Sequence, residues 1–268
     1  MDQKKLIKMG RLSKDTWNKL ADEDAEFYIL TNKGKEGGRW NSNEFLETGK
    51  EEWGGFKKFL AHHGLENTIS KNKTALDMGC GVGRIAFAIA QDFSKVFGID
   101  ASDIMIEKAK KYQKQLNIKN LEFLVNNGID LSLISDGSID FVFSHLTLQH
   151  CPSSKQILAY IKEFSRILKP SGVCLFQVKV APTFFSYFRF MLSERLAKIR
   201  HFFKKDYYAT KGAFFGSWIY YPHIYKIISQ NFSSYQLIQA PVEIYKDRFN
   251  DKFSIVAKQK RSFWICIK

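Results

Sequence analysis

The fold is decided by the stretch Leu76-Asp77-Met78-Gly79-Cys80-Gly81-Val82-Gly83-Arg84-Ile85-Ala86. The apolar run that ends at Met78 predicts a buried strand, the three alternating glycines predict a tight turn, and the apolar spacing after Gly83 predicts the start of a helix. A corner of this kind brings the free backbone N–H groups of a helix start close to a bound nucleotide. The dinucleotide fingerprint G-x-G-x-x-G is not met, because Arg84 stands where the third glycine would be.

The size of the chain suits one decorated α/β domain. It has 268 residues, of which 45% are hydrophobic, and this is enough for a large core. We expect a single domain over residues 1–268, with a helical cap (1–72), a ligand-binding core (73–182), a helical insertion (183–230) and C-terminal strands (231–268). No apolar run reaches the ~18 residues of a membrane-spanning helix. The first residues lead into no signal-peptide region, so we expect a cytoplasmic protein.

Cysteine and charge narrow the possible functions. The four cysteines form no C-x-x-C pair, so we expect buried free thiols and neither a metal site nor a disulfide framework. The net charge of +14 predicts attraction to phosphates, nucleic acid or an anionic membrane surface. Because lysine is spread along the chain, an ordinary solvated surface is the alternative.

From residue 73 the pattern alternates between strand and helix. We predict strands at 73–78, 95–99, 121–126, 139–144 and 173–178, and helices at 84–91, 104–116 and 154–168. This alternation is typical of a doubly wound, mostly parallel sheet. Strands at 235–238 and 253–258 are expected to complete it, antiparallel at its edge.

The segment after the fifth strand interrupts this alternation. Aromatic and aliphatic residues recur at three- and four-residue steps from Phe185 to Phe203, among several lysines and arginines. This pattern predicts a basic amphipathic helix, followed by a second helix at 221–230. We favour a lid over the acceptor pocket for the first helix, with a membrane or RNA contact as the alternatives.

Polar residues follow the predicted parallel strands, where ligands of such sheets bind. The Asp100 carboxylate can accept two hydrogen bonds from a ribose diol, and the Asn127 amide, beside Gly128, can bond an adenine edge. Asp77 would repel a diphosphate and suits a cation such as an α-ammonium group.

Four segments in the right order and spacing resemble class I S-adenosylmethionine-dependent methyltransferases. They span about 100 residues and are Leu76–Gly83, Phe97–Ser102, Ile139–Ser144 and Phe164–Val173. The resemblance implies a seven-stranded sheet with an antiparallel last strand, and S-adenosylmethionine as cofactor. The matched positions imply these cofactor-binding residues: Asp77, Gly79, Cys80, Gly81, Gly83, Asp100, Ala101, Ser102, Asn127, Gly128 and Ser144. Asn127 departs from the acid that is usual at its position, and Arg84 or Arg39 could pair with the cofactor carboxylate.

The reaction implied is attack by an acceptor oxygen or nitrogen on the sulfonium methyl group. His150 and His145 follow the fourth strand and are the candidate general bases, although His150 could instead only hydrogen-bond its loop. We expect a small-molecule or glycan acceptor, such as a phosphorylated metabolite or a surface-saccharide precursor. The alternatives are an RNA acceptor and a lipid-linked acceptor reached at a membrane surface. The sequence carries no signal for an oligomeric state.

Overall fold

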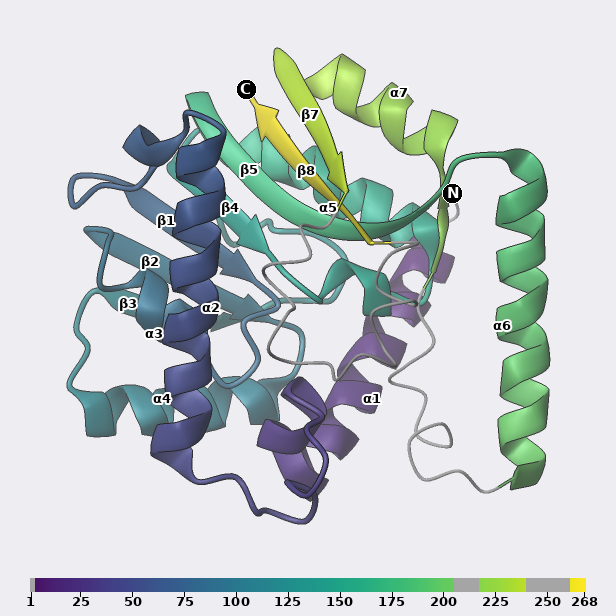
Figure 1. The fold of residues 1–268 in the computed structure, drawn as a ribbon, viewed down its shortest axis with the longest axis horizontal. Helices are drawn as coiled ribbons and strands as arrows, with labels where there is room; N and C mark the ends of the chain where they lie inside the picture. Colours follow the sequence, from purple (N-terminus) through teal and green to yellow (C-terminus); the bar gives the residue numbers. More distant parts are fainter. Residues whose placement is uncertain (1–2, 205–216, 240–260) are drawn as a thin grey trace.

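A computed structural model describes residues 3–204, 217–239 and 261–268. Its centre is a twisted sheet with the strand order β3-β2-β1-β4-β5-β8-β7, and the short β6 pairs with β5 (Figure 1). The strands are β1 (Thr74–Met78), β2 (Lys95–Asp100), β3 (Leu121–Val125), β4 (Ile139–Ser144), β5 (Leu168–Ala181), β6 (Ile219–Tyr220), β7 (Ser234–Gln239) and β8 (Arg261–Ile267). All pairs are parallel except those that β8 makes with β5 and β7. The predicted fold class is confirmed.

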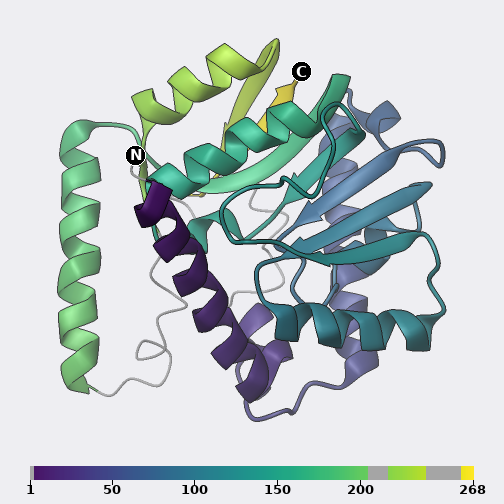
Figure 2. The same ribbon diagram turned by 180° about the vertical axis from the view of Figure 1, so that it is seen from behind.

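Helices cover both faces of this sheet. They are α1 (Gln3–Ile29), α2 (Ser42–His62), α3 (Ala86–Ile89), α4 (Asp103–Leu116), α5 (Ser154–Ile167), α6 (Phe184–Lys204) and α7 (Tyr221–Asn231), with the short turns η1 (Glu66–Thr68) and η2 (Leu148–His150). One core cluster joins the sheet to α1, α2, α3 and α4, and another joins it to α5 and α7 (Figures 1 and 2). Because the central strands are buried on both sides, they read as continuous apolar runs.

Several element boundaries differ from the prediction. The strand predicted at 253–258 lies outside the described residues, and the antiparallel strand beside β5 is β8. Within the expected helical cap, helix α2 begins at Ser42, because the Asn41 side chain caps it by accepting from the backbone N–H groups of Asn43 and Glu44. Helix α4 agrees well with the prediction: Ser102 caps it by accepting from the Met105 N–H (3.1 Å).

Helix α1 crosses the carboxyl ends of the strands and closes one side of the site. It kinks at Asp24, whose carboxylate accepts from the backbone N–H groups of Phe27 (3.3 Å) and Gly38 (2.9 Å). Nearer the N-terminus of α1, Gly10 packs directly on the loop after β3. A Cβ at Gly10 would overlap the carbonyl oxygen of Asn127, and a Cβ at Gly128 would overlap the backbone of Gly10. This glycine contact sets how closely α1 approaches the sheet.

Candidate functional site

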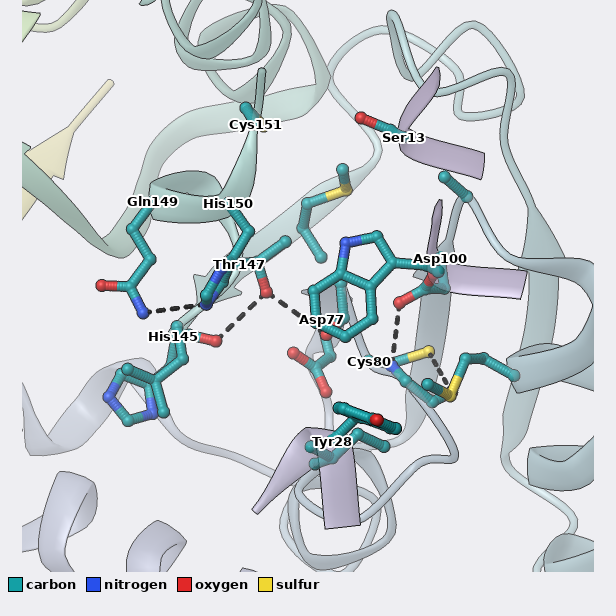
Figure 3. Close-up of a pocket in the computed structure, with 18 of the residues that line it drawn as sticks. Ser13, Tyr28, Asp77, Cys80, Asp100, His145, Thr147, Gln149, His150 and Cys151 are labelled. Carbon is teal, nitrogen blue, oxygen red and sulfur yellow. Dashed lines mark hydrogen bonds between the residues drawn. The ribbon is translucent and has the colours of Figure 1, made fainter. Parts of the chain in front are cut away.

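A pocket opens at the carboxyl ends of β1, β2 and β4, where the strand order reverses (Figure 3). Ligands of open α/β sheets bind at such a switch point. The sheet side of the lining includes Asp77, Gly79 and Asp100, and the opposite side comes from α1 and the residues after it, including Trp17 and Tyr28. The N-terminal cap is therefore part of the site and not only a cover of the core.

The glycine corner is fixed by backbone geometry and by space. Gly79, Gly81 and Gly83 all have positive φ (77°, 55° and 89°), which favours glycine. A Cβ at Gly79 would overlap Thr147, and one at Gly81 would overlap Ile29. The backbone N–H groups of Gly79 and Cys80 donate to the Ile99 carbonyl at 2.6 and 3.0 Å. The corner is thereby held between β1 and β2.

Asp100 joins this corner to the start of α4. Its carboxylate accepts from the Gly81 N–H (3.0 Å) and from the Ser102 N–H (2.9 Å). The pKa of Asp100 is raised above its ordinary value, because burial raises it by more than these hydrogen bonds lower it. Asp100 and Ala101 line the pocket. Ser102 is buried and does not line it, since its hydroxyl caps α4 and donates to the Asn18 side chain of α1 (2.6 Å).

Asp77 is a buried carboxyl group that faces the same pocket. Burial is the main cause that raises its pKa to about 7; Arg84 lowers the pKa, and the charges of Asp100 and Glu52 raise it. A group with this pKa is only partly ionised at neutral pH. A cation bound beside it would stabilise the carboxylate.

Arg84 and His145 meet on one buried carboxylate, that of Glu52 from α2. The Arg84 guanidinium lies 2.6 Å from Glu52 Oε2 and also donates to the Thr48 hydroxyl (3.1 Å). The His145 Nδ1 lies 2.5 Å from Glu52 Oε1, and its ring packs edge-on against Phe56. The side chains of Glu52, Arg84 and His145 are almost completely buried. The arrangement links the cap helix α2 to the glycine corner and to the end of β4.

The adenine end predicted around Asn127 has an unexpected arrangement. The Asn127 side chain is exposed, and its carbonyl oxygen accepts from the backbone N–H groups of Ile129 and Asp130. Gly128 does line the pocket. The neighbouring Asn126 is buried and donates to the Tyr160 hydroxyl (3.1 Å), which also lines the pocket.

His150 and Thr147 lie on the loop after β4 and line the pocket (Figure 3). The His150 ring contacts Trp17 of α1 edge-on, with centroids 5.6 Å apart, and its Nε2 lies 3.1 Å from Gln149 Nε2. Ser144 is fully buried and donates to the Met78 carbonyl (3.1 Å), so its side chain faces β1. Arg39 is exposed and does not line this pocket.

Comparison with known proteins identifies the family. A family model described as "Methyltransferase domain" matches residues 69–209, more than half of the chain. The chain belongs to this methyltransferase family. Its resemblance to class I S-adenosylmethionine-dependent methyltransferases is thereby confirmed.

Curated relatives match the methyltransferase core. The chain is 31% identical over 126 residues to the probable S-adenosylmethionine-dependent methyltransferase CRG1 of Saccharomyces cerevisiae, covering 45% of this chain and 42% of that protein. It is 29% identical over 134 residues to the demethylmenaquinone methyltransferase of Geobacillus stearothermophilus, covering 46% and 56%. The matches thus span about half the length of these relatives. Among solved structures, YcgJ from Bacillus subtilis has the same fold, with a TM-score of 0.56, 18% identity and coverage of 81% of this chain and 98% of that one.

Some residues of the site belong to no local sequence motif and could not be assigned to the site from one. Glu52 is 32 residues from Arg84 and 93 from His145, so only the packing of α2 on the sheet brings the three together. The signal that could have found it is an acid on an apolar helix face, because Glu52 stands three residues after Gly49 and four before Phe56, which are both buried. Trp17, Tyr28, Asn126 and Tyr160 are further site residues that the sequence reading did not assign.

We expect that replacing Glu52 by alanine destabilises this methyltransferase domain strongly. The change leaves the buried guanidinium of Arg84 without its carboxylate partner and also removes the partner of the His145 ring, and loss of one member of a buried ion pair typically costs about 3–5 kcal/mol of unfolding free energy. Glu51→Ala, on the exposed side of the same helix turn, is the matched control and should change stability by less than about 0.5 kcal/mol. Urea unfolding measures both changes in unfolding free energy. Equal changes would show that Glu52 contributes no more to stability than the exposed Glu51.

Proposed function

We propose that this domain transfers the methyl group of S-adenosylmethionine to a small-molecule acceptor bound between the glycine corner and α1. The observation that carries the proposal is the joint presence of Asp77, Asp100, Gly79 and Gly81 in one pocket. S-adenosylmethionine is cationic at its sulfonium and ammonium groups, and it supplies the activated methyl group.

The residues present fit this cofactor. Asp77 is a buried carboxyl group whose raised pKa would fall beside a cation, which suits the α-ammonium group. Asp100 has a carboxylate at the position that suits the ribose hydroxyls. Added Cβ atoms would fill the space at Gly79 and Gly81, so the methionine part can approach the backbone there. The backbone at Ala101 and Gly128 would border the adenine.

The acceptor would lie against the wall that α1 supplies. Trp17, Tyr28, Ile29 and Leu30 make this wall largely apolar and aromatic. Among the described lining residues there is no lysine, and the one arginine, Arg84, is paired with Glu52. These features favour an acceptor with an apolar or aromatic body over a phosphorylated one. The relative named for demethylmenaquinone supports the class of small-molecule acceptors.

We assign the proton transfer to His150, not to His145. Both histidines line the pocket, but the His145 ring is buried and paired with Glu52, whereas His150 is only half-buried. In this assignment the acceptor O–H or N–H gives its proton to the His150 imidazole while its oxygen or nitrogen attacks the methyl carbon, and the methyl–sulfur bond breaks. Most of the rate enhancement would come from holding the two reactants in line.

The test is methyl transfer with cofactor labelled at the methyl group, first against a panel of small acceptors and then with His150→Ala. We expect labelled product from the wild type, and a decrease in kcat of about 100-fold or more in His150→Ala, with an unchanged dissociation constant for the cofactor. His62→Ala, an exposed histidine on α2, should leave kcat unchanged. Full activity of His150→Ala would remove its role, and absence of labelled product from every acceptor would argue against the small-molecule function.

A further inference from the structure

Helix α6 has a stripe of exposed apolar side chains. Its large members are Phe184, Phe185, Phe188, Leu192 and Leu196, which are 67%, 76%, 59%, 46% and 56% exposed. At about 100° per residue, these five positions fall on an arc of about 120° around the helix. So many large exposed apolar groups on one face are characteristic of an interaction site.

A different side of α6 holds the helix on the body of the domain. Phe190 is buried and stacks on Trp218 with ring centroids 4.2 Å apart. Tyr187 packs near Tyr220, next to the end of β5. In Figures 1 and 2 the remainder of α6 extends along the side of the molecule, away from the sheet. The attachment through Phe190 and Tyr187 lies outside the stripe, although Phe184 of the stripe also contacts Tyr220, with ring centroids 6.1 Å apart.

The lid that we expected from the sequence is not supported by the described contacts. None of the residues that line the described pocket belongs to α6. Across residues 3–204, 217–239 and 261–268, no helix is long and apolar enough to cross a bilayer. A helix that is apolar on one exposed face, and is not a membrane span, suits the plane of a membrane surface.

The net positive charge of α6 indicates which kind of membrane surface it would bind. By sequence, Phe184–Lys204 carries five basic residues (Arg189, Arg195, Lys198, Arg200 and Lys204) and one acidic residue (Glu194), and the whole chain has a net charge of +14. A second copy of this helix would bring like charges together, whereas anionic headgroups would neutralise them. We propose that α6 docks the domain on an anionic membrane surface, with its aromatic stripe inserted among the headgroups. This inference does not depend on the proposed reaction.

Sedimentation of the full chain with lipid vesicles tests the proposal. The probes are phosphatidylcholine vesicles and vesicles in which roughly one third of the lipid is phosphatidylglycerol. We expect binding to the anionic vesicles, at least about tenfold weaker binding to the neutral ones, and loss of binding as salt is added. Equal binding to both kinds of vesicle, or binding to neither, would overturn the proposal.

The stripe is tested by the double variant Phe185→Ser/Phe188→Ser. Its matched control is Leu133→Ser, which changes a residue that is 56% exposed on the loop between β3 and β4. We expect the double variant to lose at least about tenfold in vesicle binding and the control to bind like the wild type, with all three proteins binding the cofactor equally. Unchanged vesicle binding by the double variant would overturn the proposal. So would a dimer of the lipid-free wild type that the double variant lacks, because a second copy would then cover the stripe.

Discussion

Replacing Asp100 by alanine should raise the dissociation constant for S-adenosylmethionine at least about 100-fold, from the loss of charge-assisted hydrogen bonds to the ribose. The same carboxylate also accepts from the backbone N–H groups of Gly81 and Ser102. Its removal therefore takes away both a group that would bind the ribose and the hydrogen bonds by which Asp100 holds the glycine corner. Calorimetric titration measures the change.

Two further variants separate lost binding from lost folding. Glu107→Gln lies on α4 near Asp100, where Glu107 forms an exposed ion pair with Lys111, and it should bind the cofactor as the wild type does. Asp100→Asn keeps an acceptor oxygen and should lose less affinity than Asp100→Ala. If Asp100→Ala melts cooperatively and still binds with nearly wild-type affinity, the ribose assignment is wrong.

Cofactor affinity should depend on pH through Asp77. The pKa of this carboxyl group is about 7 in the folded protein, against 3.8 for a free group. The α-ammonium group needs the ionised form of Asp77, so affinity should weaken as the pH falls from 8 through 7. Between pH 8 and pH 6 we expect a loss of about tenfold, or about 1.4 kcal/mol. The fragment 5′-methylthioadenosine, which lacks the amino-acid part, is the control ligand and should show no such dependence.

The same pKa makes a prediction for the stability of the protein without ligand. Because the folded-state pKa lies above the unfolded one, the folded state holds the proton more tightly. The stability that Asp77 contributes is fully present below about pH 4 and is lost as the pH rises through about 7. Asp77→Asn should therefore melt at a higher temperature than the wild type at pH 8, yet bind the cofactor poorly and without the pH dependence. A melting temperature and pH profile like those of the wild type would contradict this account of Asp77.

The parallel core was predictable because its signals are local. Apolar runs mark β1 to β4, and apolar residues at helical spacing mark the helices between them. The glycine corner is also marked locally, because its positive φ angles favour glycine. The last strand was not predictable in the same way. Residues 261–267 form a strand through their long-range pairing with β5, which no local pattern in the sequence specifies.

The site was predictable as far as it depends on strand ends. Asp77, Asp100 and Gly128 line one pocket, as the positions after parallel strands imply. The side-chain direction at Asn126 and Asn127 depends on the twist of a single loop, and the sequence does not specify it. The partnership of Glu52 with Arg84 and His145 depends on how α2 packs on the sheet. For α6 the sequence indicated an amphipathic helix, but its attachment through Phe190 and Trp218 decides which apolar residues stay exposed.

The central claim is that the glycine corner binds a sulfonium cofactor and not a dinucleotide. Calorimetric titration of the wild-type chain at pH 8, with S-adenosylmethionine and then with NAD, tests it most directly. We expect one S-adenosylmethionine to bind per chain, with a dissociation constant on the order of 1–100 μM, and no measurable heat from NAD. Absence of heat with S-adenosylmethionine, or equally tight binding of NAD, would contradict the claim.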